Sequence, residues 1–187
     1  CVHTAEVVSS SLTRPTTSKP TPLSLIIFRP SASMIMFNKI LVTIDGSDPS
    51  MHALGFGADL AERDGAELVV LSVVPTVPLF AAEEAEFSYY PQLLEDMERY
   101  HEKMLAETSQ ALERDHKDMK VSTLLRKGNP TRNIVEAARK EEVDLIVIGN
   151  RGTGGIITWM LGSTSRSVAE ACTVPVLIVK DREYCEA

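Results

Sequence analysis

Short apolar runs alternate with longer segments of helical period through residues 37–180, and this alternation constrains the fold more than any other feature of the sequence. Most of the runs are apolar at every position rather than at every second one, which is typical of strands buried on both faces. Such strands, separated by helices, predict a doubly wound parallel α/β sheet with helices on both faces. The five predicted strands cover residues 39–44, 67–74, 120–127, 144–148 and 174–180.

Turn and capping residues mark where the predicted helices begin and end. Ser47 or Asp48 can cap the first helix, Pro49 suits its first turn, and Gly65 is a stop signal. The remaining segments are predicted as a long loop over residues 75–90, a helix over 91–116, a helix after residue 130 and a helix over 163–171.

Apolar spacing also predicts which helix faces are buried. The spacing in the first helix predicts a buried face made of Ala53, Phe56, Leu60 and Ala61. In the second helix His101 lies near the apolar face. We interpret it as a partly buried histidine rather than a metal ligand, because no cluster of Cys, His or Asp accompanies it.

Charge and cysteine content narrow the range of partners. The chain carries a net charge of −7, and its first 35 residues hold three basic side chains and one acid, so the remainder carries −9. An acidic domain repels nucleic acids and anionic membranes, so we expect neither as a partner. Cys1, Cys172 and Cys185 form no disulfide framework and no metal-binding pair, which predicts a reducing, cytoplasmic location.

Residues 1–35 are rich in Ser, Thr and Pro and show no helical or strand period. Their apolar stretch at residues 23–28 is too short for a transmembrane helix and lacks the features of a secretory signal. We expect residues 1–35 to be a disordered leader or a non-native extension, and residues 36–187 to form the domain. A transit peptide is the alternative, because the segment is rich in hydroxyl residues and nearly free of acids.

A glycine-rich loop followed by hydroxyl residues occupies positions 149–165, directly after the fourth predicted strand. Gly149 and Gly152 let the backbone turn sharply and let a ligand approach closely, since no Cβ is in the way. The helix that opens near Ser163 offers free N–H groups and a dipole that favour phosphate. Because the loop holds no lysine, backbone amides must neutralise most of the phosphate charge, with Arg151 as the nearest cation.

Other interpretations of this loop differ in the spacing that they require. A tight turn with Ser163 as an ordinary N-cap would explain the glycines alone. A Walker A loop is excluded, because Gly154 is followed by Gly155 rather than by lysine. A dinucleotide fingerprint is excluded because it needs GxGxxG after the first strand, which here is followed by Asp45, Gly46 and Ser47.

Asp45 follows the first predicted strand, at the edge where doubly wound sheets bind their ligands. An Asp before Gly at a strand end often forms only a turn. We favour a ligand-binding role because of this position. The same rule points to Val73 or Val74 and to the loop after Ile148.

The glycine pattern Gly-x2-Gly-x9-Gly-Ser resembles the signature of the ATP-binding branch of the universal stress protein family. It is formed here by Gly149, Gly152, Gly162 and Ser163. The resemblance extends over residues 37–180. It includes the segment Lys-Ile-Leu-Val-Thr-Ile-Asp-Gly-Ser at 39–47, Gly-Asn-Pro at 128–130 and Val-Pro-Val-Leu-Ile-Val at 174–179.

This resemblance implies a sheet ordered 3-2-1-4-5, ATP as the ligand with Mg²⁺ or Mn²⁺ held by its phosphates, and a homodimer. The last strand, residues 174–179, is the expected dimer edge, because an exposed apolar edge invites pairing with a second copy. By position, the adenine end would be lined by Thr43, Ile44, Asp45 and Val73, and the ribose by Gly149. The phosphates would be surrounded by Arg151, Gly152, Gly162, Ser163, Thr164 and Ser165, and Ile148 completes the predicted site.

Three functions remain open on the sequence. The first is a nucleotide-dependent regulatory or stress-response module, at most a slow ATPase, because no catalytic constellation is visible and all four histidines lie outside the loop. The second is an ATP-using enzyme of the related adenine nucleotide hydrolase-like fold, although its Ser-Gly-Gly-x-Asp-Ser loop does not follow the first strand here. The third is a dimerisation domain that binds no nucleotide.

Overall fold

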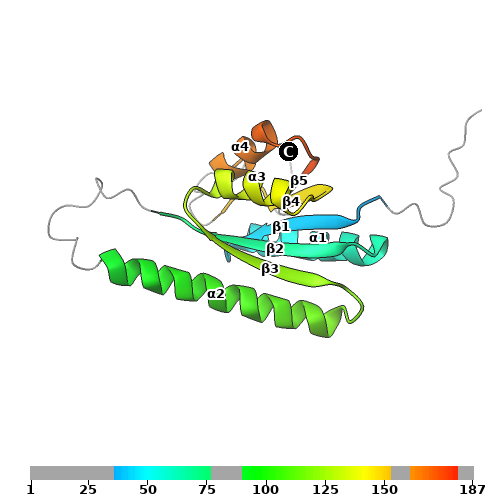
Figure 1. Cartoon of the computed structure of the whole chain (residues 1–187), viewed down its shortest axis with the longest axis horizontal. Coiled ribbons are helices and arrows are strands. Elements are labelled where there is room, and N and C mark those ends of the chain that lie inside the picture. The colour runs from blue at the N-terminus through cyan, green and yellow to red at the C-terminus, as the bar shows by residue number, and fades with distance from the viewer. Residues whose placement is uncertain (1–35, 77–89, 153–160, 181–187) are drawn as a thin grey trace, which may run out of the picture. The chain divides into compact units, whose positions relative to one another are not determined.

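The computed structural model describes residues 36–76, 90–152 and 161–180. Within them, five strands form one sheet in the order β3-β2-β1-β4-β5, and every neighbouring pair is parallel. This arrangement confirms the predicted fold class and strand order (Figure 1). The predicted extension at 1–35 and most of the predicted loop at 75–90 lie outside the described residues.

The elements follow the predicted alternation, with bounds that differ by one or two residues at most. The last strand begins later than predicted because Pro175 has no N–H to donate to the ladder. No helix in the described part of the chain is both long and apolar enough to span a membrane. The strands are β1 (Lys39–Ile44), β2 (Glu67–Val74), β3 (Val121–Lys127), β4 (Leu145–Gly149) and β5 (Val176–Val179), and the helices are α1 (Asp48–Asp64), α2 (Tyr90–Asp115), α3 (Pro130–Lys140) and α4 (Ser163–Ala171).

Two helices cover each face of the sheet (Figure 1). On one face, α1 packs on β1 and α2 on β2 and β3, in the cluster that contains Ile40, Val42 and Ile44. On the other, α3 and α4 pack in the cluster that contains Leu41. Side chains alternate along a strand, so successive residues of β1 enter opposite halves of the core. This double burial explains why β1 is apolar at four of its six positions.

The order of the strands reverses beside β1. From β1 the chain builds outward through β2 to β3, and it then returns to add β4 and β5 on the other side. The connections therefore leave β1 and β4 in opposite directions, which opens a crevice at the carboxyl ends of these two strands.

The predicted buried face of α1 is wrong at Phe56, whose side chain is 42% exposed. Ala53 and Ala61 are buried as predicted, but the residue between them on that face is Gly57. A Cβ added to Gly57 would collide with Cγ2 of Val42. The helix packs so closely on β1 that small residues occupy this face, and Phe56 is turned outward.

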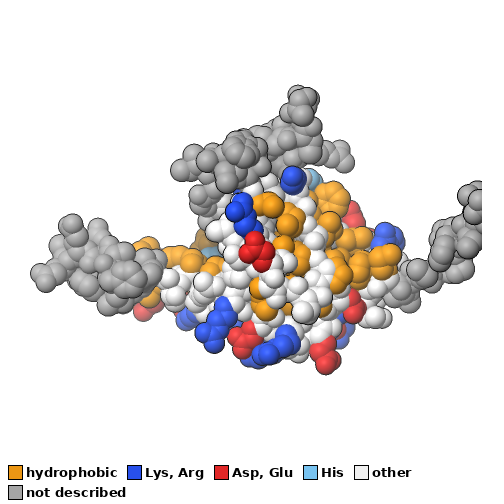
Figure 2. Space-filling model, turned by 90° about the horizontal axis from the view of Figure 1, so that it is seen from above, with side chains coloured by type: hydrophobic (Ala, Val, Ile, Leu, Met, Phe, Trp, Pro, Cys, Tyr) orange, Lys and Arg blue, Asp and Glu red, His pale blue; other side chains and the backbone are white. Residues whose placement is uncertain are grey.

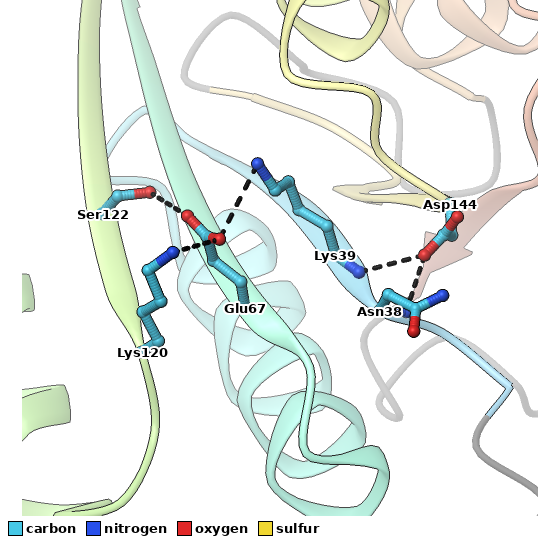
Figure 3. A network of polar contacts seen from close by, with 6 residues as sticks. All are labelled: Asn38, Lys39, Glu67, Lys120, Ser122 and Asp144. Atoms are coloured by element: carbon cyan, nitrogen blue, oxygen red, sulfur yellow. Dashed lines mark hydrogen bonds and ion pairs between the residues drawn. The ribbon is translucent and has the colours of Figure 1, made fainter.

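Charged side chains anchor the amino-terminal ends of the strands, opposite the crevice at their carboxyl ends (Figure 3). Oδ2 of Asp144 accepts hydrogen bonds from the backbone N–H groups of Asn38 (2.6 Å) and Lys39 (3.0 Å). Oε2 of Glu67 pairs with Nζ of Lys120 at 2.7 Å and with Nζ of Lys39 at 3.7 Å. These contacts tie the start of β1 to its neighbours on both sides.

Candidate functional site

A cavity of about 760 Å³ lies at the carboxyl ends of β1, β2 and β4. All twelve residues predicted for the binding site line it, so the structure brings the whole set together. Whether each of them contacts a ligand stays a prediction. The ends of β1 and β2 supply Thr43, Ile44, Asp45 and Val73, the end of β4 and its loop supply Ile148, Gly149, Arg151 and Gly152, and the start of α4 supplies Gly162, Ser163, Thr164 and Ser165.

Asp45 connects the turn after β1 with the glycine-rich loop. Its Oδ1 accepts hydrogen bonds from the N–H (3.1 Å) and the hydroxyl (2.6 Å) of Ser47, so it forms the turn that an Asp-Gly pair is expected to form. Gly46 follows with a φ of 82°, which favours glycine. On the other side, a Cβ added to Gly152 would collide with Oδ2 of Asp45. Asp45 therefore shapes the turn and also lines the cavity.

Gly149 is needed for packing between β4 and α1. A Cβ added there would lie 2.8 Å from the backbone C and O atoms of Pro49 and 3.0 Å from the backbone N of Ser50. These are backbone atoms, so no flexible side chain can move aside. Packing alone therefore explains why the first residue of the signature, Gly149, is a glycine, whether or not a ligand binds.

The start of α4 is held against the end of β4 by its own polar groups. The N–H of Gly162 donates to the carbonyl of Asn150 (2.8 Å). The hydroxyl of Ser165 contacts the carbonyl oxygens of Asn150 (3.1 Å) and Gly162 (3.0 Å), and Ser165 is only 2% exposed. Ser165 therefore holds the loop, whereas Ser163 is exposed and Thr164 half-buried.

The first turn of α4 offers backbone N–H groups to the cavity. The N-cap is Gly162 rather than Ser163, which corrects the N-cap interpretation of that serine, and no side chain caps this end within the described residues. Uncapped N–H groups and the positive end of the helix dipole attract an anion. Arg151 lines the same cavity and adds a positive charge. This end of the cavity is therefore suited to phosphate.

The described residues show no site at which side chains alone would bind a metal ion. Among them, no group of three or more His, Cys, Asp or Glu side chains is placed to hold a metal ion. A divalent cation at this site would need ligands from the bound molecule, as the phosphates of a nucleotide provide.

One wall of the cavity comes from α2, which was not predicted from the sequence to contribute to the site. Asp96, Met97, Tyr100 and His101 all line it. A Cβ added to Gly46 would collide with the hydroxyl of Tyr100, so this side chain lies directly over the turn after β1. The helical spacing placed His101 near the apolar face of α2, but spacing alone does not show where along the sheet a helix packs. The other lining residues not predicted are Ser50, Leu71, Pro75, Pro130 and Ile134.

His101 is buried more deeply than predicted, with 7% of its surface exposed. Its Nδ1 lies 2.7 Å from the hydroxyl of Ser72, and that hydroxyl donates to the carbonyl of Ile44 at 2.8 Å. The ring of Tyr100 meets it edge to face. Burial lowers the pKa of His101 below its ordinary value, although the carboxylate of Asp45 opposes this effect. The imidazole is therefore neutral at pH 7.

The sequence of this chain matches that of a known protein family. The sequence model described as the universal stress protein family matches residues 36–180. The chain belongs to the universal stress protein family. A universal stress protein of Bacillus subtilis, YxiE, is 37% identical over 150 residues, which cover 78% of this chain and 100% of that protein.

Solved universal stress proteins share the fold. The protein UspA of Lactobacillus plantarum matches with a TM-score of 0.69 and 25% identity, over 76% of this chain and 97% of that one. A universal stress protein crystallised in complex with cAMP matches with a TM-score of 0.54 and 25% identity, over 78% of this chain and 98% of that one. The doubly wound sheet is thus the fold of the family.

Proposed function

We propose that this universal stress protein domain binds an adenine nucleotide, with ATP as the expected ligand, in the cavity at the carboxyl ends of β1, β2 and β4. The observation that carries the proposal is the uncapped start of α4 beside a loop whose Gly152 leaves no room for a Cβ next to Asp45. The relative crystallised with cAMP supports the class of ligand.

The two ends of the cavity differ in the chemistry that they offer. Backbone N–H groups at Ser163 and Thr164, with Arg151 nearby, suit phosphates. At the other end, apolar side chains, among them Val73 of β2 and Met97 of α2, suit the face of a purine. A nucleotide has these two parts, and a Mg²⁺ or Mn²⁺ ion would be held by its phosphates.

We further propose that ATP is sensed rather than consumed, in a regulatory or stress-response role. The described lining of the cavity contains no lysine and no glutamate, and its histidine lies on α2 rather than beside α4. The carboxylate next to the loop, Asp45, already accepts two hydrogen bonds from Ser47 at Oδ1, and no lysine of the described lining neutralises the phosphates, so hydrolysis should be slow. Fast ATP turnover with a second substrate would contradict this role and favour an ATP-using enzyme.

Nucleotide extraction tests the proposal. The full chain, purified without added nucleotide, is denatured with acid, and any released nucleotide is identified by chromatography and mass spectrometry. We expect an adenine nucleotide from the wild-type protein. Gly152→Val and Gly162→Val should release little or none, because the added side chains would meet Asp45 and the carbonyl of Asn150.

Gly55→Val is the matched control, because Gly55 lies on α1 with nothing within 4 Å of an added Cβ. This variant should retain the nucleotide. Circular dichroism must show that all three variants are folded. If folded Gly152→Val and Gly162→Val both keep wild-type amounts of nucleotide, the assignment of the site is wrong.

We also propose a cytoplasmic homodimer that pairs through β5. This strand is at the edge of the sheet, and its Leu177 is 37% exposed. Figure 2, which views the molecule from the side of α3 and α4, shows hydrophobic side chains grouped together with charged ones mainly around them. Exposed apolar surface at a strand edge favours pairing with a second copy. A single-chain mass in sedimentation at micromolar concentration would contradict the dimer.

A further inference from the structure

His101 is a buried titratable group in the wall of the cavity, and phosphate binding gives it no role. It lies on α2, and its only hydrogen bond to a described residue is made by Nδ1 to Ser72. The other ring nitrogen, Nε2, has no hydrogen-bond partner among the described residues, although the side chain lines the cavity. A ligand in the cavity can therefore use Nε2.

The hydrogen bonds of Ser72 determine which ring nitrogen carries the proton. A serine hydroxyl has one hydrogen, and that of Ser72 is donated to the carbonyl of Ile44 at 2.8 Å. In its contact with Nδ1 of His101, 2.7 Å away, the hydroxyl must then be the acceptor. Nδ1 is therefore protonated, and the neutral ring presents a lone pair at Nε2.

The position of His101 determines which part of a nucleotide it meets. Its partner Ser72 lies on β2, whereas the start of α4 is joined to the end of β4, on the far side of β1. If phosphates bind at α4, the base lies toward β2. At that end, a nitrogen lone pair accepts a hydrogen bond only from a donor, and the exocyclic amine is the donor that adenine carries.

We propose that His101 is a specificity residue, whose Nε2 accepts a hydrogen bond from the exocyclic amine of adenine and thereby selects 6-amino purines over 6-oxo purines. This inference rests on the proposed function. A 6-oxo purine places a carbonyl lone pair at the same position, where it faces the lone pair of Nε2 and leaves both acceptors without a hydrogen.

Paired titrations with ATP and inosine triphosphate test this selectivity. The two nucleotides share the ribose and phosphates and differ at position 6 of the base. For the full chain at pH 8, calorimetry should give a dissociation constant for inosine triphosphate about 10-fold higher than that for ATP, the effect of about 1.4 kcal/mol. In His101→Leu, which keeps an apolar body of similar size, this ratio should fall to about one.

Three further variants separate recognition from general damage to α2. His116→Leu removes a histidine just beyond the end of α2, outside the cavity, and should keep the wild-type ratio. Ser72→Ala keeps the imidazole but frees its tautomer, so the ratio should lie between those of the wild type and His101→Leu. If His101→Leu does not fold, His101→Gln serves instead. Its amide can accept from one base or donate to the other, so a ratio of about one is again expected.

Nitrogen-15 NMR of the wild-type imidazole gives a readout that is independent of affinity. The spectrum of the free protein should show a protonated Nδ1 and an unprotonated Nε2, and ATP should shift the Nε2 resonance more than inosine triphosphate does. A protonated Nε2 in the neutral ring, equal affinity of the wild type for both nucleotides, or an unchanged ratio in His101→Leu would overturn the inference. If the wild-type protein binds neither nucleotide, the proposed function itself fails.

Discussion

The glycines around the cavity are required for two different reasons, packing of the fold and formation of the binding site. Gly149 lies against the backbone of Pro49, and Gly152 lies against the carboxylate of Asp45. The first contact belongs to the fold and would exist without a ligand, whereas the second brings the loop to the cavity. The sequence pattern alone does not separate these two causes, because both require the absence of a Cβ.

Replacement of Gly149 should therefore affect stability. Gly149→Ala is expected to lower the free energy of unfolding by about 1–3 kcal/mol, the usual cost of overpacking, because neither β4 nor α1 can move aside freely. Gly55→Ala on the exposed side of α1 is the matched control and should raise it by about 0.5–1 kcal/mol. Urea denaturation followed by circular dichroism measures both. Wild-type stability of Gly149→Ala would show that this contact does not require glycine.

At the scale of elements, the sequence predicted every strand and helix of the described residues, because each apolar run is bounded by a clear turn or cap. The runs at β1, β2 and β4 are long enough to show burial on both faces. The sequence also predicted twelve of the residues that line the cavity, and these lie at or just after the ends of these strands or at the start of α4.

What the sequence did not predict depends on how elements approach one another. Phe56 fits the apolar period of α1, but the close contact of Gly57 with Val42 rotates it outward. The α2 wall with Tyr100 and His101 was missed because α2 follows a long connection whose path has no sequence signature. The pairing of His101 with Ser72 is likewise a tertiary contact between residues 29 positions apart.

The carboxylate at the start of β4 gives a prediction at this scale. The N–H of Asn38 lowers the pKa of Asp144 most, partial burial opposes the shift, and the N–H of Lys39 adds to the lowering. Because the folded-state pKa is below the unfolded value of about 3.9, this contribution to stability is present above that pH. It is lost as the pH falls through the folded-state pKa.

Asp144→Asn should accordingly lower the free energy of unfolding at pH 7 by about 1–2 kcal/mol, because the charged acceptor of two backbone N–H groups is lost. The difference from the wild type should shrink as the pH falls below the unfolded value of about 3.9 and towards the lower folded-state pKa. Urea unfolding across this pH range measures it, with the exposed Asp118→Asn as the control. A deficit of the same size at pH 3 and pH 7 would refute the electrostatic explanation.

At the scale of the whole molecule, the amino-terminal and carboxyl ends of the strands have separate roles. Asp144, Glu67 and their partners anchor β1 at the amino-terminal ends of the strands, and Gly149, Gly152, Asp45 and residues of α2 line the cavity at the carboxyl ends. The central strand, β1, runs from one end of the sheet to the other and is buried on both faces. The contacts at the amino-terminal ends of the strands thus hold the sheet in place, and the binding cavity lies at the carboxyl ends of the same sheet.

Hydrogen exchange of the full chain with and without ATP tests the central claim most directly, because it locates the ligand on the sequence. We predict slower exchange at residues 43–46, 149–152 and 162–165, and in the first half of α2, with no change in the outer strand β3 or at the amino-terminal edge around Asp144. Saturating ATP that leaves exchange at 149–152 and 162–165 unchanged, or that slows it only elsewhere, would contradict a nucleotide site at the carboxyl ends of these strands.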